Sequence, residues 1–144
     1  MNVRKLAIEA IDKIINKGGF ANIVVNEYLR KFVLSKEDKA LFTNLVYGTV
    51  QNLITIEYYL EPFIGHKRQK PWVKYLLYIS VYQLLYLRIP DYAVLNEAVE
   101  IANLKNRAIG SFVNAVLRNF LRTEIRSLDG LDEIETLSIK YSHP

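Results

Sequence analysis

The stretch WVKYLLYISVYQLLYL at residues 72–87 decides the fold. Apart from its tyrosines, it carries only one lysine, one serine and one glutamine among apolar side chains. A helix that is apolar on nearly every side belongs in the interior of a domain, with neighbours packed round it. Its tyrosines are therefore expected to fill the core. Pro71 suits a first helical turn and Pro90 ends a helix, so the sequence predicts a central helix over residues 71–88.

The composition of the 144-residue chain predicts a single all-α domain. Half of the residues (51%) are apolar, which provides a core and argues against disorder. Glycine and proline are sparse, long stretches carry helical spacing, and strand-like alternation is not sustained anywhere. We therefore expect residues 1–144 to form one helical bundle around the central helix.

Several features that the sequence lacks narrow the class of protein. Because there is no cysteine, disulfides, thiolate metal sites and cysteine nucleophiles are excluded. The central apolar run is interrupted and is shorter than the ~20 residues of a membrane span. The first five residues lead straight into a helical pattern, without the apolar segment of a signal peptide. A cytoplasmic protein with no membrane partner is the expectation.

Apolar spacing predicts three helices before the central one. The first covers residues 2–16 and ends before Gly18, and the second covers residues 21–32. The third starts at Ser35, a capping residue, and runs through Ile54 and on to Leu60, before Pro62. The glycine in the middle of this helix, at position 48, indicates close packing against a neighbour. The inner faces of these helices are predicted to include Ile14, Ile15, Ile23, Val24, Tyr28, Leu29, Leu45, Val46 and Ile54.

Three further helices are predicted after the central one, which brings the total to about seven. They cover residues 91–104, with Asp91 as the N-terminal cap, residues 107–126, and residues 132–141. The inner faces of the first two are predicted to consist of Val94, Leu95, Ala98, Ile101, Ala102, Ile109, Phe112, Val113, Val116, Leu117, Phe120 and Leu121.

Charge is distributed unevenly along the chain. Residues 1–123 hold 17 Lys and Arg against 10 Asp and Glu, whereas residues 124–144 hold 2 against 5. A basic body with an acidic tail suits a partner that bears phosphate. An ordinary solvated lysine surface is the alternative.

The basic residues fall into three groups that are candidates for phosphate contacts. Two lie at the start of the first helix, three in the most basic loop at residues 65–71, and two at four-residue spacing late in the helix over 107–126. The candidate RNA contacts are Arg4, Lys5, Lys67, Arg68, Lys70, Arg118 and Arg122. A strip of arginines can hold successive phosphates. Alternatively, the arginines pack on acids of the tail, such as Asp132 or Glu133.

The residues needed for catalysis or for a metal site are not assembled in this sequence. Its two histidines, His66 and His143, have no second histidine nearby, so no metal ligands and no catalytic residues are assigned. A glycine-rich turn between a strand and a helix, as S-adenosylmethionine sites normally need, is not visible. No cofactor is therefore expected in this chain.

Three motifs between Tyr82 and Arg118 resemble the NusB family of helical RNA-binding domains. They read YQLLYLRIP at 82–90, LNEAVEIA at 95–102 and FVNAVLR at 112–118. In detail the order is more similar to the NusB-like amino-terminal domain of rRNA cytosine-5 methyltransferases of the RsmB (Sun, Fmu) family. The motif residues with a structural role are Pro90, Asn96, Glu97 and Asn114. Glu97 is interpreted as a helix cap or loop anchor, not as a general base.

The resemblance implies an accessory role in a longer protein. Methyltransferases of this family use a cysteine thiolate and S-adenosylmethionine, so the active site of such a protein would follow Pro144. The ending YSHP resembles the lead-in to that catalytic part, which predicts that residues 1–144 are the amino-terminal piece of a longer chain. Two other functions stay open: a NusB-type transcription antitermination factor, and an interaction module that docks on a catalytic domain.

Overall fold

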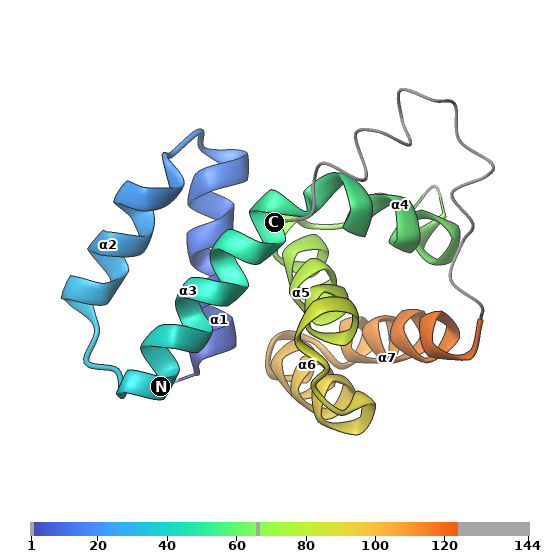
Figure 1. Cartoon of the computed structure of the whole chain (residues 1–144). Coiled ribbons are helices and arrows are strands. Elements are labelled where there is room, and N and C mark those ends of the chain that lie inside the picture. Colours follow the sequence, from blue (N-terminus) through green and yellow to red (C-terminus); the bar gives the residue numbers. More distant parts are fainter. Residues whose placement is uncertain (1, 66, 124–144) are drawn as a thin grey trace.

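The computed structural model describes residues 2–65 and 67–123, and within these ranges it contains seven α-helices and no strand (Figure 1). The helices are α1 (Val3–Ile11), α2 (Ala21–Lys31), α3 (Lys36–Gln51), α4 (Leu53–Ile64), α5 (Pro71–Tyr82), α6 (Asp91–Lys105) and α7 (Arg107–Arg122). A π-helical turn extends α1 over Asp12–Asn16, and another extends α5 over Gln83–Leu87. The prediction of an all-α bundle is confirmed.

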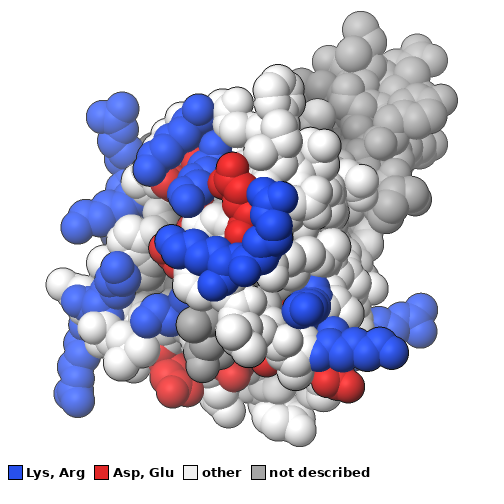
Figure 2. Space-filling view, turned by 90° about the vertical axis from the view of Figure 1, so that its left-hand side faces the viewer, with Lys and Arg blue, Asp and Glu red and all other residues white. Residues whose placement is uncertain are grey.

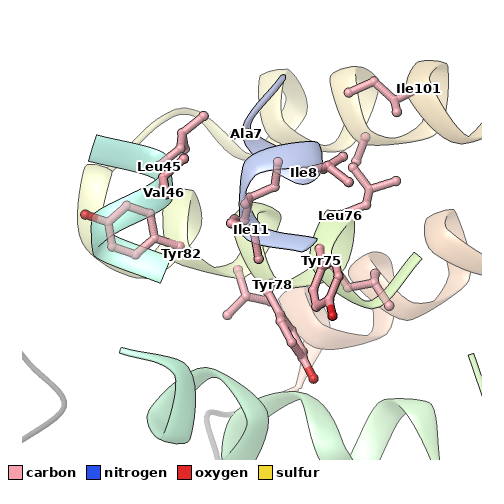
Figure 3. Close-up of a cluster of buried hydrophobic side chains, with 14 of the residues drawn as sticks. Ala7, Ile8, Ile11, Leu45, Val46, Tyr75, Leu76, Tyr78, Tyr82 and Ile101 are labelled. Atoms are coloured by element: carbon pink, nitrogen blue, oxygen red, sulfur yellow. The ribbon is translucent and has the colours of Figure 1, made fainter. Parts of the chain in front are cut away.

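Helix α5 is the centre of the bundle, as the sequence predicted. It contacts α1, α3, α4, α6 and α7, and nine of its twelve residues are buried. Pro71 occupies its first turn, because the missing N–H of proline costs nothing there. Figure 3 shows its side chains among those of Ile8 and Ile11 from α1, Leu45 and Val46 from α3, and Ile101 from α6.

The tyrosines of the central helix belong to the core. Tyr75, Tyr78 and Tyr82 are buried, and Tyr86 packs against the same cluster. Burial raises the pKa of Tyr78 and Tyr82, and it raises the pKa of Tyr86 to about 12, since a phenolate would be poorly solvated there. These side chains therefore stay neutral at physiological pH and fill space between helices.

The predicted long helix from Ser35 to Leu60 is wrong, because the chain breaks at Asn52 into α3 and α4. Asn52 is fully buried, and its side-chain amide donates to the carbonyl of Gly48 at 2.8 Å. This bond competes with helix continuation, and the backbone at Asn52 leaves the helical region. As a result Ile54, predicted inside, is 53% exposed, and Pro62 lies within α4 and not after it.

The predicted helix ends are correct at Ser35 and wrong at Asp91. The hydroxyl of Ser35 accepts a hydrogen bond from the backbone N–H of Asp38 at 3.1 Å, which caps α3. Asp91 is the first residue of α6, and the capping position belongs to Pro90, which makes no side-chain cap bond. Helix α7 ends at Arg122, and the helix predicted over 132–141 lies outside the described residues.

Two predicted core residues near α2 are on the surface. Ile15 is 36% exposed and Ile23 is 50% exposed. Helix α2 packs mainly on α1 and α3 along a narrow arc made by Val24, Val25 and Tyr28, so the flank that carries Ile23 is left open. The remaining predicted inner faces, including all five residues on α6, are at least partly buried.

Candidate nucleic-acid interface

The side chain of Arg4 is mostly buried at the edge of the bundle, where residues from other helices bind it. Its Nε donates to the side-chain oxygen of Gln83 at 3.0 Å, and its guanidinium lies 4.0 Å from the carboxylate of Glu97. Only 18% of the Arg4 side chain is exposed. Gln83 is itself buried, and its amide nitrogen donates to the carbonyl of Ile79 at 2.9 Å. Arg4 thus ties α1 to the end of the central helix and to α6.

The family-motif residues Asn96, Glu97 and Asn114 lie on helix surfaces. Glu97 is in the middle of α6, so it is neither a cap nor a loop anchor, and its structural role is the ion pair with Arg4. Asn96 is exposed beside it. Asn114 accepts a hydrogen bond from Nε of Arg118 at 3.0 Å. The motif therefore contains two residues, Glu97 and Asn114, that position arginines.

The described cations of the basic loop, in residues 67–70, are on the surface. Helix α4 ends at Gly65, whose positive φ of 67° stops the helix. The side chains of Lys67, Arg68 and Lys70 are exposed, and the amide of Gln69 donates to the carbonyl of Lys67 at 3.3 Å. The three predicted cations of this loop are accordingly available to a ligand.

The two candidate arginines of α7 are exposed and held along their own helix. Arg118 is bonded to Asn114, one turn earlier. Arg122 donates to the carbonyl of Arg118 at 3.4 Å and to the side chain of Asn119 at 3.1 Å. These contacts already restrict the conformations of the arginine side chains. Binding a ligand would therefore cost these side chains less conformational entropy. Arg126, which follows at the same four-residue spacing, and the acids of the tail lie outside the described residues.

The structure does not gather the candidates at one place. Phe63, at the end of α4, contacts Phe120 of α7 with ring centroids 5.7 Å apart. Arg118 and Arg122 lie two residues before and after Phe120, on the opposite and exposed face of α7, so this contact does not bring them next to the loop. Arg4 reaches the far end of α5, about 18 Å from the loop at 1.5 Å per residue. Lys5, next to it on α1, is exposed.

A second basic region, missed by the sequence reasoning, covers α1 to α3. Figure 2 shows this face, on which groups of Lys and Arg side chains alternate with uncharged surface and with Asp and Glu. Lys13 lies 4.8 Å from the centre of the Tyr28 ring, and Lys31 lies 5.3 Å from that of Phe32. Lys17 pairs with Asp12 at 3.7 Å. Only the tertiary fold gathers these lysines, which are scattered in the sequence.

Ion pairs leave most of the positive charge uncompensated. Over residues 2–65 and 67–123, Arg4 and Lys17 are the cations that lie within 4.0 Å of a carboxylate. The described residues contain no group of three His, Cys, Asp or Glu that could hold a metal ion. Nor does any helix in the described ranges have the length and apolar character needed to cross a bilayer. The exposed and unpaired cations of the described residues suit the binding of anions.

Comparisons with known proteins agree on one family. The family model described as the NusB family matches residues 1–122. The probable ribosomal RNA small subunit methyltransferase B of Bacillus subtilis is 42% identical to 99% of the chain. Ribosomal RNA small subunit methyltransferase B of Klebsiella pneumoniae is 34% identical over the whole chain. The match covers 33% of each of these two proteins, so the chain spans about a third of their length.

A solved structure has the same fold. NusB from T. maritima superposes with a TM-score of 0.74, over 86% of this chain and 91% of its own, at 21% sequence identity. The all-helical arrangement is shared although four residues in five differ.

Proposed function

The chain belongs to the NusB family, and on this basis we propose that it is an RNA-binding domain that helps an rRNA cytosine-C5 methyltransferase engage small-subunit rRNA. The observation that carries the proposal is the 42% identity with a probable rRNA methyltransferase B, of which the chain spans about a third. In this proposal the chain is one domain of a longer protein, whose catalytic part supplies the cysteine and binds S-adenosylmethionine.

The surface supports a partner that carries phosphate. Lys5, the loop cations and the α7 arginines are exposed, and in the described structure none of them is paired with a carboxylate. Exposed cations next to RNA phosphates release counterions, which favours binding without any base contact. A single domain of this kind is expected to bind weakly, because a tethered catalytic domain would add contacts and raise the effective concentration.

We expect the affinity for rRNA fragments to fall steeply as salt is raised. On single strands the log–log slope is about −0.7 per phosphate contact, so Arg68→Ala should flatten it by about 0.7 and the Arg118→Ala/Arg122→Ala pair by about 1.4. Fluorescence anisotropy of labelled fragments at several salt concentrations measures both slope and affinity. Gln51→Ala, an uncharged and exposed position, is the control and should leave the slope unchanged.

The outcomes separate the proposal from its rivals. A wild-type chain that shows no salt-dependent binding would contradict RNA binding and favour a module that docks on a catalytic domain. Variants that bind like the wild type would mean that RNA uses other cations, with the proposed function intact. A strong preference for antitermination RNA over small-subunit rRNA would favour a NusB-type factor.

We also expect no methyl transfer by the 144-residue chain alone, because it has no cysteine to add to the cytosine ring. The measurement is transfer of label from S-adenosylmethionine to unmodified small-subunit rRNA. Methylation above the background of a heat-denatured sample would overturn the proposal that this domain is accessory.

A further inference from the structure

We propose that the basic loop and the turn between α6 and α7 form one binding surface for the RNA phosphate backbone, with Trp72 between the two segments. This inference rests on the proposed RNA-binding function and assigns it a place. The cations of this surface, which we call the Trp72 surface, are Lys67, Arg68, Lys70, Lys105 and Arg107. Lys105 and Arg107 were not among the candidates from sequence.

Trp72 joins the two segments physically. The ammonium of Lys105, the last residue of α6, lies 5.7 Å from the centre of the Trp72 ring. A cation over an indole face is attracted by the negative potential of the ring. Trp72 therefore fixes Lys105 next to the start of α5, although the two residues are far apart in the sequence.

The cations on either side of Trp72 are fixed by helix ends. The carbonyl of Lys70 accepts from the N–H groups of Val73 and Lys74 at 3.0 and 3.2 Å, which anchors the end of the loop to α5. Across from it, the side chain of Asn106 accepts from the N–H of Ala108 at 2.7 Å and caps α7. A single residue, Asn106, separates Lys105 from Arg107, so this cap sets the position of both.

The charge of this surface is not compensated. All five cations are exposed, and within the described residues none of them lies in an ion pair with a carboxylate. Lys74 is not included, because its charge acts on Glu57 of α4. Five exposed cations without a carboxylate partner suit a polyanion.

The ligand is inferred to be the backbone and not the bases. One face of Trp72 is covered by Lys105, and the ring itself is half-buried, so a base has little aromatic surface on which to stack. The exposed lysine and arginine side chains of the two segments are suited to phosphate oxygens. Binding here should therefore tolerate changes of RNA sequence.

The single tryptophan of the chain makes the site directly observable. Single-stranded RNA of mixed sequence is titrated into the 144-residue chain while tryptophan emission and the anisotropy of labelled RNA are recorded together. We expect both signals to change with the same midpoint. RNA that binds by anisotropy without altering tryptophan emission would overturn the inference, and this test requires no variant to fold.

A matched pair of double variants tests the cations. Lys105→Ala/Arg107→Ala removes two contacts, which at 0.1 M salt should weaken binding roughly 25-fold and flatten the slope by about 1.4. Arg30→Ala/Lys31→Ala is the control on α2: it also removes two exposed charges and a lysine over an aromatic ring, and it should bind like the wild type. Circular dichroism verifies that both variants fold.

The outcomes distinguish this inference from the proposed function. If the control loses affinity and Lys105→Ala/Arg107→Ala does not, RNA lies on the face of α1 to α3, and the inference fails while RNA binding stands. If the wild type shows no salt-dependent binding, the proposed function fails and the inference fails with it.

Discussion

Leu117→Ala is expected to destabilise the domain by about 2–5 kcal/mol, the range for a leucine removed from a packed core. Leu117 lies on α7 with none of its surface exposed, in the cluster that contains the central helix. The substitution leaves a cavity that rigid helices cannot close. The free energy of unfolding of a small domain is only about 5–15 kcal/mol, so this substitution would remove a large part of it. Urea unfolding followed by circular dichroism measures the change.

Leu→Ala substitutions at two other positions serve as comparisons for the loss of stability at Leu117. Leu104, on α6, is 70% exposed, so Leu104→Ala should change stability by less than about 0.5 kcal/mol. Leu84 belongs to the apolar stretch that was predicted to lie in the interior, but the structure leaves it half-buried at the π-helical end of α5. The loss of stability from Leu84→Ala should therefore fall between the other two. Equal midpoints for all three variants would show that the inner face of α7 has been misplaced.

Gly48→Ala is expected to destabilise the domain, although it adds only one methyl group. A Cβ atom at this position would lie 2.5 Å from Cε1 of Tyr82, and closer still to Cζ and the hydroxyl oxygen. The tyrosine cannot move without loss, because its hydroxyl donates to the side chain of Asn44. Overpacking of this kind costs about 1–3 kcal/mol or more, which outweighs the gain of about 1 kcal/mol from replacing a helical glycine.

A double-mutant cycle separates this clash from other effects. In a Tyr82→Leu background the obstructing ring is absent, so Gly48→Ala should become neutral or stabilising there. Thermal unfolding of the four proteins supplies the cycle. If Gly48→Ala costs the same with and without the ring of Tyr82, close packing is not the reason for the glycine.

The features of the fold that were predictable from sequence are those set by local pattern. The central helix, the inner face of α6 and the Ser35 cap each follow from residues that are near in sequence. The break at Asn52 was not predictable, because apolar spacing continues through it and only the backbone angles of one residue change there. The exposure of Ile15 and Ile23 likewise depends on which helices happen to cover α2.

The candidate interface was predictable to the extent that its charges are consecutive. The loop cations stand within four residues of one another, and the structure places them on the surface. Arg4 also looked exposed from sequence, yet its partners Gln83 and Glu97 come from distant segments. The proximity of Lys105 to Trp72 depends on how α6 returns to the start of α5, which no local pattern encodes. Whether RNA uses any of these residues stays a prediction.

The hydrogen bond from Arg4 to Gln83 limits when α1 can complete its contacts during translation. It joins positions 79 residues apart, and the ion pair to Glu97 spans still more. During translation at about 5–20 residues per second, α1 leaves the ribosome on the order of ten seconds before α6 exists. The apolar stripe of α1 can pack on α2 and α3 early in that interval, but its contacts with α5 and the bonds of Arg4 form only later. Nascent chains that end before α5 should therefore be captured by chaperones and cut by proteases more readily than longer ones.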